Sequence, residues 1–360
     1  MDELSSDLEI LPEWMQATRA ILARPGVVVL LGGSDSGKTT LARILAGAWT
    51  TAGRTVGLVD GDIGQSSVGP PTTVGLTILP PGSAAGPFPA PWALSFVGST
   101  SPPGHFLAHI LGTQALVHMA IAEGAEIVLV DTTGLIQGPV AASLKWHKLQ
   151  AIRPQYVLAL QRETELEPIL QLVEGRSDML IQRLPVSSRV VRRSLAARRA
   201  FREEQFRDYF AAAEERELSW KDLCFSRLWL NTGRRVGGDG LEALGAFLQT
   251  MPLYAEVGTD EALVFVRGPF SRSAVREVRR ALQVAEVLIV DVEQLPGTLV
   301  GLHDRDNVFL ALGILRRFDP EREGIQVFTP YKEPGRIWGV AFGALCLGAG
   351  GKELGEARWR

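Results

Sequence analysis

Residues 27–47 read VVVLLGGSDSGKTTLARILAG, and this stretch decides the fold. The unbroken apolar run Val27–Leu31 is typical of a strand buried on both faces, as the strands of parallel sheets are. A glycine-rich turn follows, and the spacing then becomes helical from about Lys38 to Ala52. A buried strand that feeds a helix through a tight glycine turn predicts an α/β domain.

The turn matches the P-loop pattern G-x-x-x-x-G-K-[ST] in the strand-to-helix setting that the motif needs. Gly32 and Gly37 let the backbone curl so that its N–H groups face a phosphate, and the helix N-terminus adds partial positive charge. Lys38 is expected to reach the β- and γ-phosphates, and the Thr39 hydroxyl to ligate Mg²⁺. The residues predicted to bind the nucleotide are Gly32, Gly33, Ser34, Asp35, Ser36, Gly37, Lys38, Thr39 and Thr40.

Three further stretches have the texture of buried strands: Thr55–Asp60, Glu126–Asp131 and Gln155–Leu160. Helical segments such as Phe106–Glu123 separate them. Strands that alternate with helices predict a parallel sheet with helices on both faces. The fold class is therefore an α/β P-loop NTPase core.

The chain of 360 residues is longer than one hydrophobic core usually supports, so we expect two domains. Residues 1–25 are predicted to form a short helical lead, and residues 26–251 the P-loop domain with an arginine-rich lid near 183–210. After residue 252 short apolar runs are split by glycine and proline, which predicts a smaller β-rich domain over 252–360.

Charge and composition exclude several classes of protein. Thirty-seven basic and 40 acidic residues give a net charge of −3, so contact with nucleic acid would need a local basic patch. Such a patch is present, because residues 183–207 hold many arginines and only two acids.

No apolar run approaches the roughly 18 residues of a spanning helix, and no signal peptide is apparent. With only Cys224 and Cys346, the chain is predicted to be cytoplasmic, without a membrane partner.

Two predicted strands end in acidic residues. Asp60 and Asp62 follow one strand, and Asp131 ends another. Ligands of open α/β sheets bind at the carboxyl edge, where these side chains are expected to lie. One carboxylate could serve a bound Mg²⁺, and a second could accept a proton from an attacking hydroxyl. The sequence leaves open whether Asp62 or Asp131 is the closer metal-side carboxylate.

A P-loop alone does not select the reaction. A guanine-reading N-K-x-D is expected after a later strand in GTPases, yet the strand ending at Leu160 is followed by QRETE. This disfavours GTP, although DTTG at residues 131–134 is similar to the D-x-x-G of GTPases.

Longer strings of residues resemble the polynucleotide 5′-hydroxyl kinase family. This family includes the kinase of the eukaryotic pre-mRNA cleavage complex, the nucleolar pre-rRNA processing kinase and their archaeal relatives. The resemblance rests on the P-loop, DGDIGQSSVGPPTTVGL at 60–76, FVGSTSPPGH at 96–105, DTTGLIQG at 131–138, and VVRRSLAARRAFREEQFRDYF at 190–210. A C-terminal β-rich region with GLHD and VFTP completes it.

The resemblance implies an enzyme that transfers the γ-phosphoryl group of ATP, with Mg²⁺, to the 5′-hydroxyl end of RNA or DNA. It implies a base or metal-side carboxylate, an acceptor clasp and a lid over the triphosphate. The residues that match these parts are Asp62 and Gln65 in the Walker B segment, Thr132 and Gly134 in the clasp, and Arg193 and Arg198 in the lid. Arginine suits the lid because guanidinium groups neutralise phosphoryl oxygens with bidentate geometry.

Two alternatives stay open at this level: an ATP-binding assembly factor in RNA processing that transfers nothing, and a P-loop switch that hydrolyses nucleotide.

Leu135 also stands where the family often has an aromatic residue after the clasp glycine, so one base-stacking ring is missing. His105 and His109 have the spacing of a metal pair but lack an acidic ligand, which favours ordinary surface or core histidines. Trp146 is predicted to pack inward from an amphipathic helix.

Overall fold

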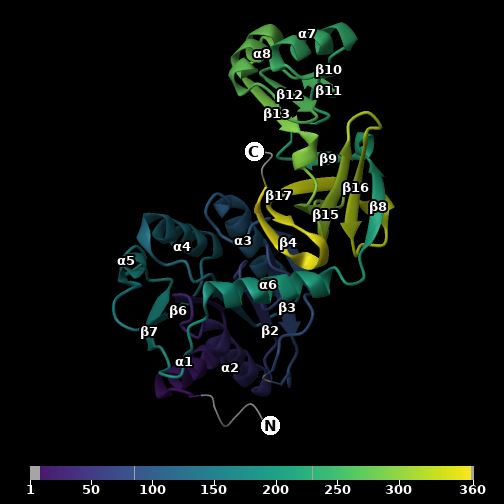
Figure 1. Cartoon of the computed structure of the whole chain (residues 1–360). Coiled ribbons are helices and arrows are strands. Elements are labelled where there is room, and N and C mark those ends of the chain that lie inside the picture. The colour runs from purple at the N-terminus through teal and green to yellow at the C-terminus, as the bar shows by residue number, and fades with distance from the viewer. Residues whose placement is uncertain (1–8, 85, 229, 358–360) are drawn as a thin grey trace. The chain divides into compact units, whose positions relative to one another are not determined.

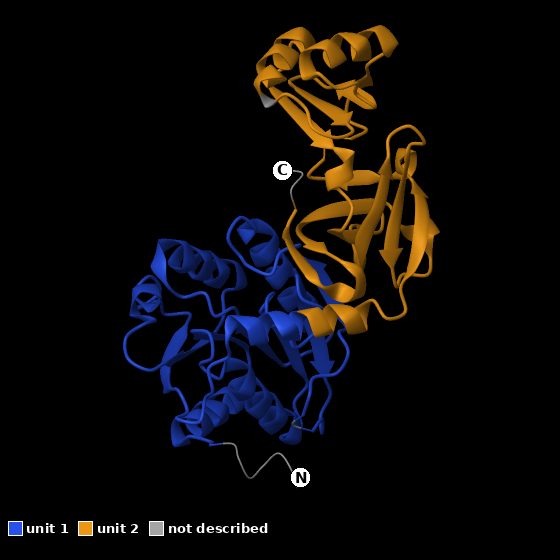
Figure 2. Cartoon of the chain, in the orientation of Figure 1, with its two compact units in different colours: residues 1–202 blue, residues 203–360 orange. Residues whose placement is uncertain are grey.

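The computed structural model describes residues 9–84, 86–228 and 230–357, and the chain divides into two compact units, residues 1–202 and 203–360 (Figure 2). This division differs from the predicted boundary at residues 251 and 252. The reason is strand pairing: β8 (Glu214–Ser219) pairs antiparallel with β16 (Gly324–Thr329), which places it in a sheet of the second unit. Residues 1–8 of the predicted lead lie outside the described residues.

The first unit is built on a seven-stranded sheet with the order β4-β3-β2-β5-β1-β6-β7 (Figure 1). The strands are β1 Val27–Gly32, β2 Val56–Gly61, β3 Thr73–Leu79, β4 Ala93–Phe96, β5 Ile127–Thr132, β6 Tyr156–Gln161 and β7 Leu180–Pro185. The four predicted strands are β1, β2, β5 and β6, which run parallel as expected. At the β2 edge the sheet is mixed, because β3 pairs antiparallel with both β2 and β4.

Helices cover both faces of this sheet, as the sequence predicts. They are α1 Pro12–Ala23, α2 Lys38–Thr51, α3 Phe106–Ala122, α4 Gly138–Ile152 and α5 Glu167–Leu170, while α6 Leu195–Tyr209 runs across the boundary between the units. Alternate residues of β1 face two separate cores. Val29 and Leu31 join the core with α3 and α4, and Val28 and Leu30 join the core with α1 and α2. The continuous apolar run of β1 is thus explained by burial on both faces.

The second unit is rich in strands, as predicted. One sheet has the order β18-β17-β14-β15-β16-β8 with β9 paired to β17, and a smaller one has the order β10-β11-β12-β13. The remaining strands are β9 Cys224–Ser226, β10 Arg234–Arg235, β11 Tyr254–Val257, β12 Glu261–Val266, β13 Glu286–Asp291, β14 Thr298–His303, β15 Phe309–Asp319, β17 Gly339–Leu347 and β18 Glu353–Glu356. Two helices, α7 Gly238–Leu248 and α8 Val275–Leu282, accompany them.

Within the described ranges, no helix is both long enough and apolar enough to cross a membrane.

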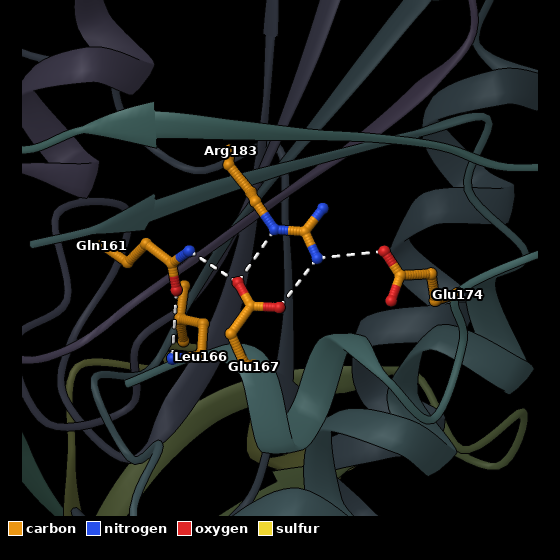
Figure 3. A network of polar contacts seen from close by, with 5 residues as sticks. All are labelled: Gln161, Leu166, Glu167, Glu174 and Arg183. Carbon is orange, nitrogen blue, oxygen red and sulfur yellow. Dashed lines mark hydrogen bonds and ion pairs between the residues drawn. The ribbon is translucent and has the colours of Figure 1, made fainter. Parts of the chain in front are cut away.

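Arg183, the first arginine of the predicted lid region, forms ion pairs next to the sheet. Arg183 lies in β7, and its guanidinium donates to both carboxylate oxygens of Glu167, at 2.8 and 2.7 Å, and to Glu174 at 3.0 Å (Figure 3). Gln161 donates to the same Glu167 carboxylate at 2.7 Å. This network ties the end of β6 to α5 and β7.

This network predicts an acid-dependent contribution to stability. Hydrogen bonds from Arg183 lower the pKa of Glu167 from its ordinary value near 4.5 to about 2. A carboxyl group whose pKa is lower in the folded than in the unfolded chain stabilises the fold at pH values above its unfolded-state pKa. This stabilisation is lost as the pH falls toward about 2. The free energy of unfolding of Glu167→Gln, measured by denaturation, is therefore expected to lie below that of wild type at pH 7. The expected difference is less than about 1 kcal/mol for so exposed a pair, and it is smaller near pH 3. A difference that grows on acidification would contradict this assignment.

Candidate active site

The P-loop connects β1 to α2 through residues 33–37. Asp35 and Gly37 adopt positive φ angles of 52° and 84°, which turn the backbone between the strand and the helix. A Cβ atom at Gly32 would lie 2.5 Å from Ser36 Oγ, so this position requires glycine. The Ser36 hydroxyl is buried and finds no hydrogen-bond partner among the described residues. The loop therefore carries a polar group that a bound phosphate oxygen could satisfy.

Lys38, the first residue of α2, is buried at the centre of this loop. Its Nζ donates to the carbonyl oxygen of Gly33 at 2.8 Å. Because the ammonium group has three donors, this contact leaves capacity for phosphate oxygens. Lys38 therefore lies against the loop backbone, and its contact with the β- and γ-phosphates stays a prediction.

Thr39 and Asp131 meet at the end of the sheet. Thr39 Oγ1 donates to Asp131 Oδ2 at 2.7 Å, while Asp131 Oδ1 is buried with no partner in the described part of the chain. Burial raises the pKa of the Asp131 carboxyl, and Lys38 and the hydrogen bond from Thr39 oppose that rise. A hydroxyl beside a carboxylate with an unsatisfied oxygen fits a hard divalent cation such as Mg²⁺. The structure therefore brings Asp131, and not Asp62, within hydrogen-bond distance of Thr39.

Asp60 is the neighbour of Asp131 on the adjacent strand, β2 beside β5. Its side chain binds the loop that follows β2. Its carboxylate accepts from the backbone N–H groups of Asp62, Ser67 and Val68, at 2.9, 2.5 and 3.1 Å. Desolvation, followed by repulsion from Asp131, raises the pKa of Asp60 to about 7. Asp60 therefore shapes the turn that presents Asp62.

Asp62 lies in that turn and is half-buried. Its Oδ1 accepts from the backbone N–H groups of Gly64 and Gln65, at 3.1 and 3.0 Å. The Gln65 side chain donates to the carbonyl oxygen of Arg198 at 3.2 Å, so the predicted Walker B segment contacts the predicted lid. These contacts orient the Asp62 carboxylate while Oδ2 accepts no hydrogen bond from the described residues.

The predicted clasp lies directly against the P-loop. Thr132 Oγ1 donates to the carbonyl oxygen of Leu30 at 2.7 Å, within β1 and two residues before its last residue. A Cβ atom at Gly134 would lie 2.5 Å from the backbone nitrogen of Ser34, so the two loops touch where only glycine fits. Thr132 and Gly134 therefore lie beside the residues that the sequence predicts to bind the nucleotide.

The two predicted lid arginines differ in their contacts. The Arg198 guanidinium donates to Asp35 Oδ2 at 2.6 Å, and this carboxylate also accepts from the backbone N–H of Arg193 at 3.2 Å. The Arg193 guanidinium instead lies over the Phe201 ring, 5.8 Å from its centroid. The structure thus brings the Arg198 side chain to the P-loop, and Arg193 only through its backbone.

The contact between Asp35 and the lid predicts a loosened lid in Asp35→Asn. Asparagine tolerates the positive φ angle at this position, but a neutral amide binds a guanidinium more weakly than a carboxylate does. We expect trypsin to cleave the nucleotide-free variant within residues 189–199 about fivefold faster than wild type, equivalent to about 1 kcal/mol of local opening. Asp178→Asn, which removes an exposed ion pair with Arg176 elsewhere in the unit, is the matched control. Equal cleavage of Asp35→Asn and wild type would show that the contact does not hold the lid.

Two buried lysines near the site are not predicted from the sequence. Lys145 and Lys148 of α4 are both 1% exposed, whereas Trp146 between them is 37% exposed, so the prediction that Trp146 packs inward was wrong. A signal was present, because both lysines occupy the apolar stripe of the helix. The buried positions of α4 are Ala141, Leu144, Lys145, Lys148, Leu149 and Ile152.

Both lysines lie near the acidic strand ends. Burial lowers the pKa of Lys145 well below its ordinary value, and it lowers that of Lys148 to about 7 against the opposing effect of Asp62 and Asp60. Lys148 Nζ is 2.9 Å from His109 Nε2, which is itself 2.8 Å from the carbonyl oxygen of Gly61. Of the surface and core positions that the sequence left open for His109, the structure shows the core, since its ring is fully buried in these contacts.

Comparison with known proteins gives a consistent result. Residues 32–212 match the family model described as mRNA cleavage and polyadenylation factor CLP1 P-loop. The polyribonucleotide 5′-hydroxyl-kinase of Methanocaldococcus jannaschii is 30% identical over 335 residues, which cover 92% of this chain and 90% of that protein. The polyribonucleotide 5′-hydroxyl-kinase of Pyrococcus furiosus is 31% identical over 341 residues, covering 94% and 93%.

A solved complex of Clp1p with Pcf11p shares the fold. Its TM-score is 0.58 at 14% identity, and the match covers 92% of this chain and 78% of that chain.

Proposed function

The chain belongs to the CLP1 P-loop family, and on this premise we propose that it is an ATP-dependent polynucleotide 5′-hydroxyl kinase. It transfers the γ-phosphoryl group of ATP to the 5′-hydroxyl end of a polynucleotide. RNA is the proposed acceptor, following the names of the two archaeal relatives, and DNA is the comparison that the assay must include.

One observation carries the proposal: three segments far apart in sequence contact the same P-loop. Asp131 at the end of β5 binds Thr39, Gly134 of the clasp packs against Ser34, and Arg198 of the lid binds Asp35. A phosphoryl-transfer site needs a cation-binding pair, an acceptor-side wall and positive charge over the transferring group. These three contacts would supply them around one loop.

The roles of the residues follow from these positions. The P-loop amides and Lys38 bind the triphosphate, and Arg198 and Arg193 turn from their present contacts toward the γ-phosphoryl group. Asp62 accepts the proton of the 5′-hydroxyl, whose oxygen forms a bond to the γ-phosphorus as the bond to ADP breaks. Gln65, Thr132 and Gly134 position the acceptor. Thr39 and Asp131 would hold Mg²⁺, with Asp62 as the second candidate ligand, and the ion would neutralise charge on the phosphate oxygens.

The proposal also covers base recognition by the acceptor side and the cellular location of the protein. Leu135 replaces a stacking ring with an aliphatic side chain, so base recognition is expected to be broad. Cys224 and Cys346 are not joined in a disulfide, in keeping with a reducing cytoplasm.

The test is transfer from γ-labelled ATP to matched 5′-hydroxyl RNA and DNA oligonucleotides in the presence of Mg²⁺. Label on the oligonucleotide end supports the kinase, and a preference for RNA supports the proposed acceptor. Release of phosphate to water alone would instead identify a hydrolytic switch, and tight ATP binding without turnover would identify a binding factor. Oligonucleotides that already carry a 5′-phosphate serve as the control and should accept no label.

A further inference from the structure

Lys145 is a fully buried lysine whose amino group faces the clasp. It lies in α4, and the structure surrounds it with the chain rather than with solvent. Its Nζ donates to three oxygens: Thr132 Oγ1 at 2.9 Å, the carbonyl oxygen of Thr133 at 2.6 Å and Thr133 Oγ1 at 3.4 Å. All three oxygens belong to Thr132 and Thr133, so every hydrogen bond that this amino group makes within the described residues goes to the clasp.

The hydrogen bonds continue from the clasp to the P-loop strand. Thr132 Oγ1 accepts from Lys145 and donates to the carbonyl oxygen of Leu30, two residues before Gly32. The same clasp then presses Gly134 against the backbone nitrogen of Ser34. The clasp is therefore held between the Lys145 amino group on one side and the P-loop backbone on the other.

Lys148 provides a natural comparison on the same helix. It is as deeply buried as Lys145 and lies three residues further along α4. Its Nζ contacts His109 Nε2 and makes no hydrogen bond to the clasp within the described residues. The two lysines thus separate the effect of a buried charge in α4 from the effect of a direct bond to the clasp.

We propose that Lys145 is the positioning residue of the clasp: its three hydrogen bonds set Thr132, Thr133 and Gly134 at the distance from the P-loop that the acceptor end requires. This inference rests on the proposed kinase function for its consequence in catalysis. Lys145 acts through the clasp and does not touch the reacting groups. Removing the donor of a buried hydrogen bond leaves the acceptor oxygen unsatisfied, so the clasp would lose the contacts that hold it.

The kinetic test replaces Lys145 by methionine, which keeps the length of the side chain and removes its donors. We expect KM for a 5′-hydroxyl oligonucleotide to rise about 10-fold or more, with KM for ATP within about twofold of wild type. Lys148→Met is the matched control, and its KM for the oligonucleotide is expected to stay within about twofold. Equal changes in both variants, or parallel changes in both KM values, would overturn the inference and indicate a loss of packing.

A double-mutant cycle with Thr132→Val asks whether Lys145 acts through the clasp. If it does, the two substitutions together raise KM for the oligonucleotide by much less than the product of their separate effects. Multiplicative effects would contradict the proposed route.

A second measurement does not depend on activity, so it also covers a Lys145→Met variant that transfers nothing. Hydrogen exchange of the clasp amides at residues 132–135 is expected to be at least about 10-fold faster in Lys145→Met than in wild type or in Lys148→Met. Unchanged exchange would refute the inference even if the wild-type protein is an active kinase. Faster exchange in a protein whose wild type transfers no phosphoryl group would refute the proposed function and leave the positioning role of Lys145 supported. If Lys145→Met does not fold, Thr132→Val supplies the same exchange measurement, with the hydrogen bonds of Thr132 Oγ1 to Lys145 and to the carbonyl oxygen of Leu30 both removed.

Discussion

Lys38→Ala loses phosphoryl transfer, with kcat/KM expected to fall about 1,000-fold or more. Lys38 is the buried cation inside the loop, and its ammonium is held by the carbonyl oxygen of Gly33 at 2.8 Å, within reach of the phosphates that the loop would bind. Alanine leaves the charge of the transferring group without its lysine partner. The measurement is transfer of label to a 5′-hydroxyl oligonucleotide, with ATP affinity determined by calorimetry.

A second cation at the same loop provides the control for this experiment. Arg162 donates to the carbonyl oxygen of Asp35 at 2.9 Å from an exposed position. Arg162→Ala is expected to keep kcat/KM within about threefold of wild type, as surface substitutions usually do. Transfer by Lys38→Ala at a rate within tenfold of wild type would contradict the assignment of the loop.

Asp62→Asn is expected to retain ATP binding while kcat falls about 100- to 10,000-fold, the range that general-base catalysis contributes. The asparagine oxygen can still accept from the N–H groups of Gly64 and Gln65, so the turn keeps its shape. The amide has no basic oxygen to take the proton of the acceptor hydroxyl. The measurements are ATP affinity and the rate of a single turnover with excess enzyme.

Asp131→Asn separates the two carboxylates. The variant can still accept the hydrogen bond from Thr39, but it loses the negative charge next to the proposed Mg²⁺ position. We expect it to need about 10-fold more Mg²⁺ for half-maximal transfer, and to recover at saturating Mg²⁺. An inactive Asp131→Asn at saturating Mg²⁺ together with an active Asp62→Asn would move the base assignment to Asp131.

Much of the first unit was predictable from local patterns. The apolar runs of β1, β2, β5 and β6 are buried on both faces, so neighbouring residues of a single strand already carry the signal of a central parallel strand. The P-loop was predictable for a similar reason, because Gly32, Gly37 and Lys38 are adjacent in sequence and their roles follow from backbone geometry.

The domain boundary was harder to predict, because it depends on contacts between distant segments. The strand Glu214–Ser219 has no apolar alternation that would mark it as part of a β-rich unit. Its membership is decided by pairing with β16, more than 100 residues later in the chain.

By itself, the sequence determined the α/β core, the nucleotide loop and the residue types available for phosphoryl transfer, because these are written in short stretches of chain. Only the tertiary structure decided which of those residues meet. It placed Asp131 rather than Asp62 beside Thr39, and it turned Lys145 inward toward the clasp while leaving Trp146 partly exposed. The physical reason is that a buried charge is tolerated only where partners from other elements satisfy it, and no local pattern shows which distant oxygens those are.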